Sequence, residues 1–175
     1  NKFTSISSFS SNVNLQKLSV SHNSLTGEIP SFPHNPNLQR LSLDNNFLSG
    51  TIPSFFSNHN LQKLYLTNNN ISGPIPSFSN NHKVYELNFA NNSLSGQLPS
   101  FANLTKLKFI YFYGNQIEGI IPDFTNCTTL QTISLDDNNI SGTIPSFESN
   151  PNLRFLYLNI NNFSGEIPNF SHNNL

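Results

Sequence analysis

The chain has 175 residues, of which 35% are hydrophobic and only 10% are charged, and its formal net charge at pH 7 is −1. This charge balance offers no broad basic surface for nucleic acid or for an anionic membrane. The sequence also contains no run of 18 consecutive apolar residues, which a membrane-spanning helix would need. The 31 Asn, 25 Ser and 10 Thr are typical of a disordered polar tract, but the apolar residues recur with a strict period, which indicates a folded chain.

A repeat of 23 residues organises the chain. Residues 1–14 form a partial repeat, and seven complete repeats without insertions follow, beginning at residues 15, 38, 61, 84, 107, 130 and 153. Each follows the pattern LxxLxLxxNxLSGxIPSF, and we number positions from its first residue. Because polar capping units are absent at both ends, we expect the array to be part of a longer chain.

Positions 4 to 6 of each repeat alternate apolar and polar residues, as in Leu64, Tyr65 and Leu66. This alternation predicts a short strand with one buried face. A 23-residue unit cannot bury that face alone, so neighbouring copies must stack as parallel strands about 4.8 Å apart. We therefore expect a solenoid with an inner parallel sheet, an outer arc of irregular or 3-10 structure, and little regular helix.

Four further positions are nearly invariant among the repeats. Gly at position 13 and Pro at position 16 are typical of bends. An inward Asn at position 9 is expected to satisfy backbone groups of its own winding and the next one, and it occurs as Asn23, Asn46, Asn69, Asn92, Asn115, Asn138 and Asn161. Phe at position 18 is expected to form a buried aromatic stack, and it occurs as Phe9, Phe32, Phe55, Phe78, Phe101, Phe124, Phe147 and Phe170.

The repeat resembles the plant-specific class of leucine-rich repeats, whose signature LxxLxLxxNxLSGxIP is matched by residues 61–76 and 130–145. The resemblance covers residues 4–175 and implies an α/β-type leucine-rich repeat solenoid, a recognition function without enzymatic activity, and an extracellular or cell-surface location. The repeat has 23 residues where the class more often has 24, and the cysteine-paired caps of that class are absent.

No catalytic motif is present: a phosphate-binding glycine loop, HExxH and GxSxG are all missing. Cys127 is interpreted as a small buried hydrophobe, the alternative being a reactive or intermolecular thiol. Asp44 and Asp136 are four windings apart, about 19 Å, which is too far for a pair of catalytic carboxylates. We expect no catalytic residue, no metal site and no cofactor.

Function is instead expected on the concave face of the inner sheet, where positions 3, 5 and 7 point away from the core. The candidate ligand-binding residues are the basic Lys17, Arg40 and Lys63 and the aromatic Tyr65, Phe109, Tyr111, Tyr113, Phe155 and Tyr157. Exposed aromatic rings are typical of recognition surfaces. The alternatives are cross-strand packing for the rings and solvated edge residues for the basic column.

Seven sequons for N-glycosylation permit, but do not require, a secreted location. Their acceptors are Asn70, Asn91, Asn103, Asn126, Asn139, Asn162 and Asn169. Three of them, Asn70, Asn139 and Asn162, share position 10 and are expected to face solvent.

Three functions fit this pattern. The first is recognition of a protein, peptide or glycan by the concave face. The second is a structural glycoprotein rod or fibre of a cell wall, matrix or surface filament, in which the partners are further repeat units of the same assembly. The third is ice binding, which needs a regular rank of Thr and is disfavoured because position 14 is mixed. No nucleic-acid partner and no membrane insertion of this segment are expected.

Overall fold

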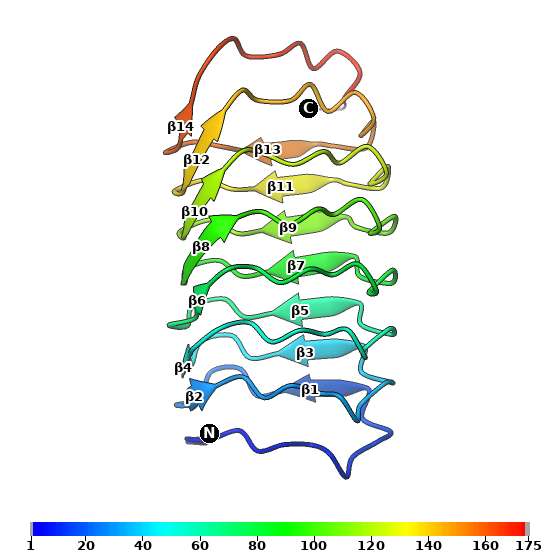
Figure 1. Ribbon diagram of the computed structural model, residues 1–175, viewed down its shortest axis with the longest axis vertical. Coiled ribbons are helices and arrows are strands. Elements are labelled where there is room, and N and C mark those ends of the chain that lie inside the picture. Colours follow the sequence, from blue (N-terminus) through cyan, green and yellow to red (C-terminus); the bar gives the residue numbers. More distant parts are fainter. Residues whose placement is uncertain (1, 174–175) are drawn as a thin grey trace.

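The computed structural model describes residues 2–173 as a stack of windings along one axis, with the two chain ends at opposite ends of the stack (Figure 1). Each complete repeat contributes one short strand at positions 3 to 5 to a seven-stranded parallel sheet of order β1-β3-β5-β7-β9-β11-β13. Its strands are β1 (Lys17–Ser19), β3 (Arg40–Ser42), β5 (Lys63–Tyr65), β7 (Glu86–Asn88), β9 (Phe109–Tyr111), β11 (Thr132–Ser134) and β13 (Phe155–Tyr157). Equivalent positions of successive repeats are paired, so the predicted parallel inner sheet is confirmed.

A second row of strands, which the sequence analysis did not predict, lies beside the inner sheet. Positions 10 to 12 also alternate, with a buried residue at position 11 such as Leu48 between exposed or half-buried neighbours, which is the pattern of a half-buried strand. The strands are β2 (Thr26–Glu28), β4 (Phe47–Ser49), β6 (Ser72–Gly73), β8 (Ser93–Gln97), β10 (Gln116–Gly119), β12 (Asn139–Gly142) and β14 (Asn162–Phe163).

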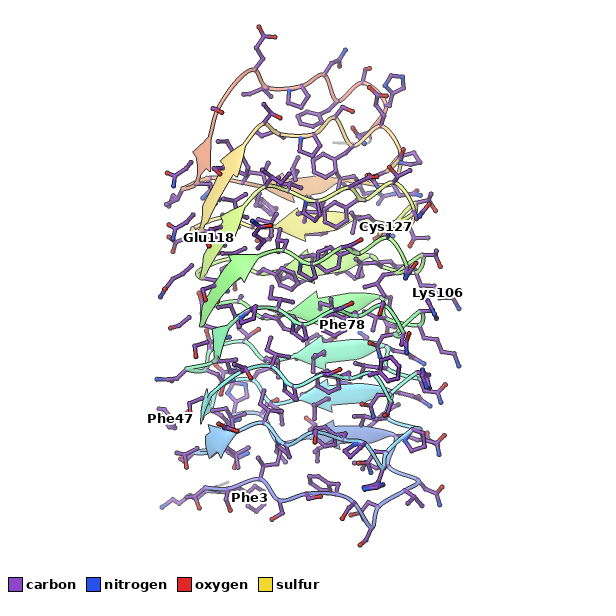
Figure 2. The ribbon with its side chains drawn as sticks, viewed as in Figure 1. Phe3, Phe47, Phe78, Lys106, Glu118 and Cys127 are labelled. Atoms are coloured by element: carbon purple, nitrogen blue, oxygen red, sulfur yellow. The ribbon has the colours of Figure 1, made fainter. Side chains whose placement is uncertain are left out.

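These flanking strands form a five-stranded parallel sheet of order β14-β12-β10-β8-β6 and a two-stranded sheet of β2 and β4. Thr26 pairs with Phe47, so the partners are offset by 21 residues rather than by a whole repeat. Figure 2 shows Phe47 and Glu118 at this flank of the stack, whereas Phe78 lies within it.

The outer arc contains turns instead of helix. At the end of the first complete repeat, Asn35 N donates to Phe32 O at 3.2 Å and Leu38 N donates to Asn35 O at 3.1 Å, which makes two successive four-residue β-turns. No α-helix or 3-10 helix occurs in residues 2–173, and none of the structure described there could cross a membrane as a helix.

The core consists of stacked apolar columns, and the predicted phenylalanine stack is largely confirmed. Rings at position 18 pack at centroid distances of 6.3 Å for Phe32 and Phe55 and 5.4 Å for Phe101 and Phe124. Phe9 and Phe170 in the outermost windings are only partly buried. Burying one such ring stabilises the fold by roughly 1.5–3 kcal/mol.

The stack does not run directly from Phe78 to Phe101. Phe78 instead packs against Phe89 at 6.2 Å, Phe89 against Phe112 at 4.9 Å, and Phe112 against Phe101 at 6.2 Å. Phe89 and Phe112 occupy position 6, where the other repeats have Leu or Val. The larger rings at that position enter the stack and connect its two halves.

The asparagine column at position 9 makes the predicted contacts with the backbone. Asn46 Nδ2 donates to Val20 O, Leu43 O and Asp44 O at 3.2, 2.9 and 3.2 Å, and its Oδ1 accepts from Leu25 N at 3.0 Å. The amide therefore connects backbone groups of two neighbouring windings at the bend after the inner strand.

A second asparagine column, at position 21, was not predicted. Asn58 is 1% exposed, and its Nδ2 donates to Phe32 O at 3.0 Å and to Asn35 O at 2.9 Å. Leu104 and Cys127 interrupt this column in the two repeats that carry Phe at position 6. Cys127 is buried, as expected, and its thiol points to Phe101 O at 3.4 Å, the bond that an Asn makes elsewhere in the column.

The backbone at position 8 is left-handed in every complete repeat. Asn, Asp, His or Gly occupies six of these positions, and such residues tolerate this conformation best. The exception is Ile160 in the last repeat, with φ of 53°. A β-branched residue is strained there.

Candidate functional site

The exposed face of the seven-stranded sheet, which we call the inner-sheet face, carries all nine candidate ligand-binding residues. The residue at position 4 of each repeat points into the core, as Leu64 does, so the residues at positions 3 and 5 point outward. Because partners in neighbouring strands have the same position in the repeat, outward side chains form straight columns across the face.

Two stacked aromatic pairs stand on this face on either side of strand β11. The rings of Phe109 and Tyr111 on β9 are 6.4 Å apart with an interplanar angle of 7°, and those of Phe155 and Tyr157 on β13 are 6.4 Å apart at 9°. Thr132 on β11 pairs with both Phe109 and Phe155. Since β9 and β13 are two strand spacings apart, the pairs stand about 10 Å from each other.

Strand β11 forms the floor between these pairs. Thr132 and Ser134 point outward, as expected for positions 3 and 5, but each is only 5% exposed. Strands on both sides carry larger side chains, which cover the two small hydroxyl residues, so the accessible surface here consists of the four rings. We call the surface formed by the rings of Phe109, Tyr111, Phe155 and Tyr157 the aromatic slot.

The two walls of the aromatic slot differ in exposure. Phe155 and Tyr157 are 53% and 47% exposed, whereas Phe109 and Tyr111 are half-buried. Burial raises the pKa of Tyr111 above its ordinary value, so its hydroxyl remains a neutral hydrogen-bonding group at physiological pH. The slot combines apolar rings with hydroxyl groups, which suits an apolar or aromatic side chain attached to a polar backbone.

The basic column lies at the other end of the face, where Lys17, Arg40 and Lys63 are neighbours in register. The next residue in the column is Glu86, and its carboxylate pairs with Lys63 Nζ at 2.8 Å. The hydrogen bond to Glu86 is the main reason why the pKa of Lys63 is raised well above its ordinary value. The column is therefore not uniformly basic.

Tyrosine rings pack against the cations of this column and restrict their positions. The guanidinium of Arg40 lies 4.9 Å from the ring centroid of Tyr65, and Lys63 Nζ lies 4.9 Å from that of Tyr85. Beside them is a hollow of about 200 Å³, lined by Lys17, Gln39, Arg40, Gln62, Lys63 and Tyr85. Tyr65 thus belongs to the basic end of the face and not to the aromatic slot.

Tyr113 is half-buried at position 7 and belongs to neither aromatic pair. The structure thus divides the nine candidates into a basic end, an aromatic slot and one separate tyrosine. The sequence analysis missed Glu86, Thr132 and Ser134. Glu86 was detectable as the acidic residue next to Lys63 in the position 3 column.

All seven sequon asparagines are exposed, including the three at position 10. Asn91 Nδ2 also donates to Asn68 Oδ1 at 2.8 Å, within a row of surface amides at position 8. Exposure meets the steric requirement for glycan attachment, and glycosylation of these residues stays a prediction.

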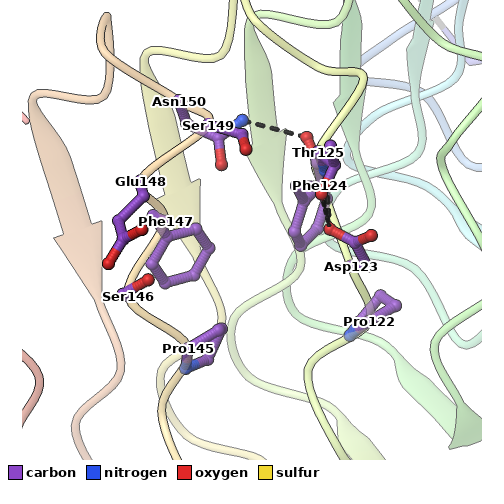
Figure 3. A pocket seen from close by; sticks show the side chains of 10 residues that line it. All are labelled: Pro122, Asp123, Phe124, Thr125, Pro145, Ser146, Phe147, Glu148, Ser149 and Asn150. Atoms are coloured by element: carbon purple, nitrogen blue, oxygen red, sulfur yellow. Dashed lines mark hydrogen bonds between the residues drawn. The ribbon is translucent and has the colours of Figure 1, made fainter.

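A hollow of about 190 Å³ lies on the outer arc between the fifth and sixth repeats (Figure 3). Its carboxylates are Asp123 and Glu148. Asp123 accepts hydrogen bonds from the backbone N–H and the hydroxyl of Thr125, and these bonds hold the pKa of its carboxyl below the ordinary value. Asp123 thus stabilises a turn, while Phe147 beside it has an unusual φ of 52°.

Within residues 2–173, no group of three or more His, Cys, Asp and Glu side chains is arranged to hold a metal ion. The inner-sheet face, with its rings and its charged end, is the candidate functional site.

Models of leucine-rich repeats match almost the whole repeat array. A model described as two copies of the leucine-rich repeat matches residues 13–51, 36–80 and 128–172. A single-repeat model matches residues 83–104 and 106–127. No curated protein matches the chain in sequence.

Solved structures of plant receptors have the same fold. The plant peptide hormone receptor RGFR1, in complex with RGF2, is 36% identical with a TM-score of 0.90. The Arabidopsis receptor kinase HAESA, in complex with the peptide hormone IDA and the co-receptor SERK1, is 37% identical with a TM-score of 0.89. The ectodomain of the membrane receptor kinase GASSHO1/SCHENGEN3 from Arabidopsis thaliana is 33% identical with a TM-score of 0.91.

Each of these matches covers 96% of this chain, but this chain spans only 28%, 30% and 21% of RGFR1, HAESA and GASSHO1/SCHENGEN3, respectively. The chain belongs to the leucine-rich repeat family and is homologous to part of the repeat region of plant receptor ectodomains.

Proposed function

We propose that the chain is a non-enzymatic recognition module that binds a peptide, or a peptide segment of a protein, along the inner-sheet face. The observation that carries the proposal is the aromatic slot, whose outer wall of Phe155 and Tyr157 is about half exposed. Stacking with Tyr and Phe gives binding surfaces much of their affinity because a rigid ring loses little conformational entropy.

The sheet also presents rows of side-chain groups at a spacing that suits an extended ligand. Columns at positions 3 and 5 repeat every strand spacing, and hydroxyl or amide groups such as Asn88 and Ser19 lie among the larger side chains. A peptide offers both polar backbone groups and apolar side chains, so it can use the hydroxyls and the rings together.

The relatives support this assignment. RGFR1 is a peptide hormone receptor that was solved in complex with RGF2, HAESA was solved with the peptide hormone IDA, and GASSHO1/SCHENGEN3 was solved as an ectodomain of a membrane receptor. We infer that this chain likewise acts outside the cell or at its surface, where its exposed sequons would be glycosylated.

A display experiment tests the proposal. A library of random 12-residue peptides is selected on the purified chain, and the affinities of recovered peptides are measured by calorimetry for the wild type and for Phe155→Ser/Tyr157→Ser. Truncating two exposed rings in the slot should weaken binding at least tenfold, about 1.4 kcal/mol or more.

Phe56→Ser is the matched control, because Phe56 is 64% exposed and lies at position 19 of the outer arc. Its substitution should leave peptide affinity unchanged. The proposal fails if no binding peptide is recovered, or if the recovered peptides bind the slot variant as tightly as the wild type.

A further inference from the structure

The two ends of the inner-sheet face, along the axis of the solenoid, differ in their chemistry. Lys17 and Arg40 lie on its first two strands, and neither has a carboxylate partner within residues 2–173. After β7, positions 3, 5 and 7 carry no Lys or Arg at all, and the aromatic slot occupies this end. The nearest cations there are Lys108 and Arg154, which precede their strands by one residue and so fall outside the outward alternation.

The ion pair of Lys63 with Glu86 marks the boundary between the two ends. It cancels the third positive charge of the column, so the uncompensated charge is confined to β1 and β3. A ligand that carried negative charge along its whole length would therefore meet cations only at one end of the face.

We propose that the ligand is a peptide with a fixed order of chemistry: one or two acidic side chains over β1 and β3, and an apolar or aromatic side chain in the aromatic slot over β11. This inference rests on the proposed function and specifies the ligand that the same face would take.

Arg40 is preorganised to bind a carboxylate. Its Nε donates to Ser42 Oγ at 2.9 Å while its guanidinium stacks over Tyr65 at 4.9 Å. The two contacts fix the plane of the guanidinium and leave its terminal nitrogens for a bidentate bond to an anion. The hollow of about 200 Å³ between Lys17, Arg40 and Lys63 provides room for the acidic side chain.

The one carboxylate of the face near Arg40, apart from Glu86, is already engaged. Asp44 accepts hydrogen bonds from Ser21 Oγ at 3.0 Å and from Thr67 N at 3.2 Å. It is half-buried and bound within its own sheet surface, and Ser42 lies between it and Arg40 in the chain. Asp44 therefore does not supply the partner that Arg40 lacks.

The apolar end extends beyond the slot. Ile160 follows strand β13 by three residues and is 70% exposed in a left-handed conformation that its side chain disfavours. Strained residues that persist in a fold are a recognised pointer to functional surfaces. Ile160 thus adds a further exposed apolar side chain to the repeat that carries Phe155 and Tyr157.

The distance between the two ends sets the spacing within the ligand. From β3 to β11 there are four strand spacings, about 19 Å, and from β1 there are five, about 24 Å. An extended peptide rises about 3.3 Å per residue. The acidic residue and the apolar anchor should therefore be about six or seven residues apart.

The peptides selected from the 12-residue library provide the test. They should be enriched in Asp or Glu separated by about six or seven residues from Phe, Tyr, Leu or Ile. Replacing that acidic residue by Gln or Asn should weaken binding to the wild type at least tenfold, but to Lys17→Gln/Arg40→Gln less than twofold, because the cations that it contacts are then already absent.

Lys106→Gln is the matched control, since Lys106 is an exposed cation outside the inner-sheet face, at the edge of the stack in Figure 2. Replacing the acidic residue of the peptide by Gln or Asn should lower its affinity for this control by the same factor as for the wild type.

The outcomes separate the inference from the proposed function. If the peptides depend on Phe155 and Tyr157 but contain no acidic residue, or contain one that is insensitive to Lys17 and Arg40, the order proposed here is wrong while peptide recognition stands. If no peptide depends on the face, both fail. A heparin octasaccharide that binds through Lys17 and Arg40 more tightly than any selected peptide would also overturn the inference, because it would identify a polyanion as the preferred ligand.

Discussion

The two asparagine columns should differ in their contribution to stability, and Asn46→Ala is the sharpest perturbation. Asn46 Oδ1 is the acceptor for Leu25 N at 3.0 Å, and Leu25 is only 1% exposed. Among the bonds described for residues 2–173, this N–H has no other acceptor. Leaving a buried donor unpaired costs about 1–3 kcal/mol.

The carbonyl groups that Asn46 contacts lose less, because each keeps one other donor. The remaining donors are Asn23 Nδ2 for Val20 O at 3.0 Å, Asn69 Nδ2 for Leu43 O at 3.1 Å and His22 N for Asp44 O at 2.9 Å. Weakening these shared bonds adds about 1 kcal/mol. We expect Asn46→Ala to lower the free energy of unfolding by about 3 kcal/mol in total.

Asn58→Ala is the matched control from the position 21 column. Asn58 contacts Phe32 O and Asn35 O, and both carbonyls also accept a backbone N–H within their turn, at 3.2 and 3.1 Å. Its loss leaves no backbone donor unpaired, so the expected cost is about 1–1.5 kcal/mol. The substitution and the depth of burial are nearly the same in the two variants.

Urea unfolding followed by circular dichroism measures both variants against the wild type. Asn46→Ala should be less stable than Asn58→Ala by about 1.5–2 kcal/mol. If the two variants unfold at the same urea concentration, or if Asn58→Ala is the weaker, the orphaned Leu25 N–H does not dominate the energetics.

Three further perturbations follow from the structure. Ile160→Asn should stabilise the chain by about 1 kcal/mol and raise its melting temperature, because Asn tolerates the left-handed conformation that strains a β-branched residue. The control is Ile167→Asn, which changes an 80% exposed residue outside that conformation. A lower melting temperature for Ile160→Asn would contradict the strain. Phe112→Ala should cost about 3–5 kcal/mol because the ring joins the two halves of the aromatic stack, whereas Phe56→Ala should cost less than about 0.5 kcal/mol; equal losses in urea unfolding would refute the role of the stack. Burial raises the pKa of Cys127 from 9.0 to about 11, so the folded thiol at pH 8 should react with Ellman's reagent about 100-fold more slowly than the unfolded one. Because the pKa of Cys127 is higher in the folded than in the unfolded chain, the contribution of this pKa difference to the free energy of unfolding is complete below pH 9 and is lost as the pH rises through 11. Fast labelling of the folded chain would contradict the burial, because it would show that Cys127 is accessible.

The repeat period predicted most of the fold because each repeat occupies one winding. The columns at positions 4, 6, 9 and 18 could be assigned from spacing alone, since stacking requires equal residues to meet. The flanking sheet was missed because positions 10 to 12 follow a bend and their alternation is only three residues long. The asparagine column at position 21 was missed because Asn is abundant throughout the chain, so a buried Asn such as Asn58 looks like its solvated neighbours.

The candidate site was predicted only in part, for a related reason. Spacing placed Phe109, Tyr111, Phe155 and Tyr157 on the inner-sheet face, but it did not reveal that their rings pair within each strand. Burial of Thr132 depends on the size of its neighbours on two other strands, and the charge of Lys63 depends on Glu86 one repeat away. Such effects arise between windings and cannot be read from one repeat at a time.

The most direct measurement of the central claim is an NMR titration of the isotope-labelled chain with a peptide selected on it. The account predicts that the largest shifts map to β9, β11 and β13, with a second group at Lys17 and Arg40 and little change along the flanking sheet. Shifts concentrated on the flanking strands β6, β8, β10, β12 and β14, or around the outer-arc hollow lined by Asp123 and Glu148, would contradict recognition by the inner-sheet face.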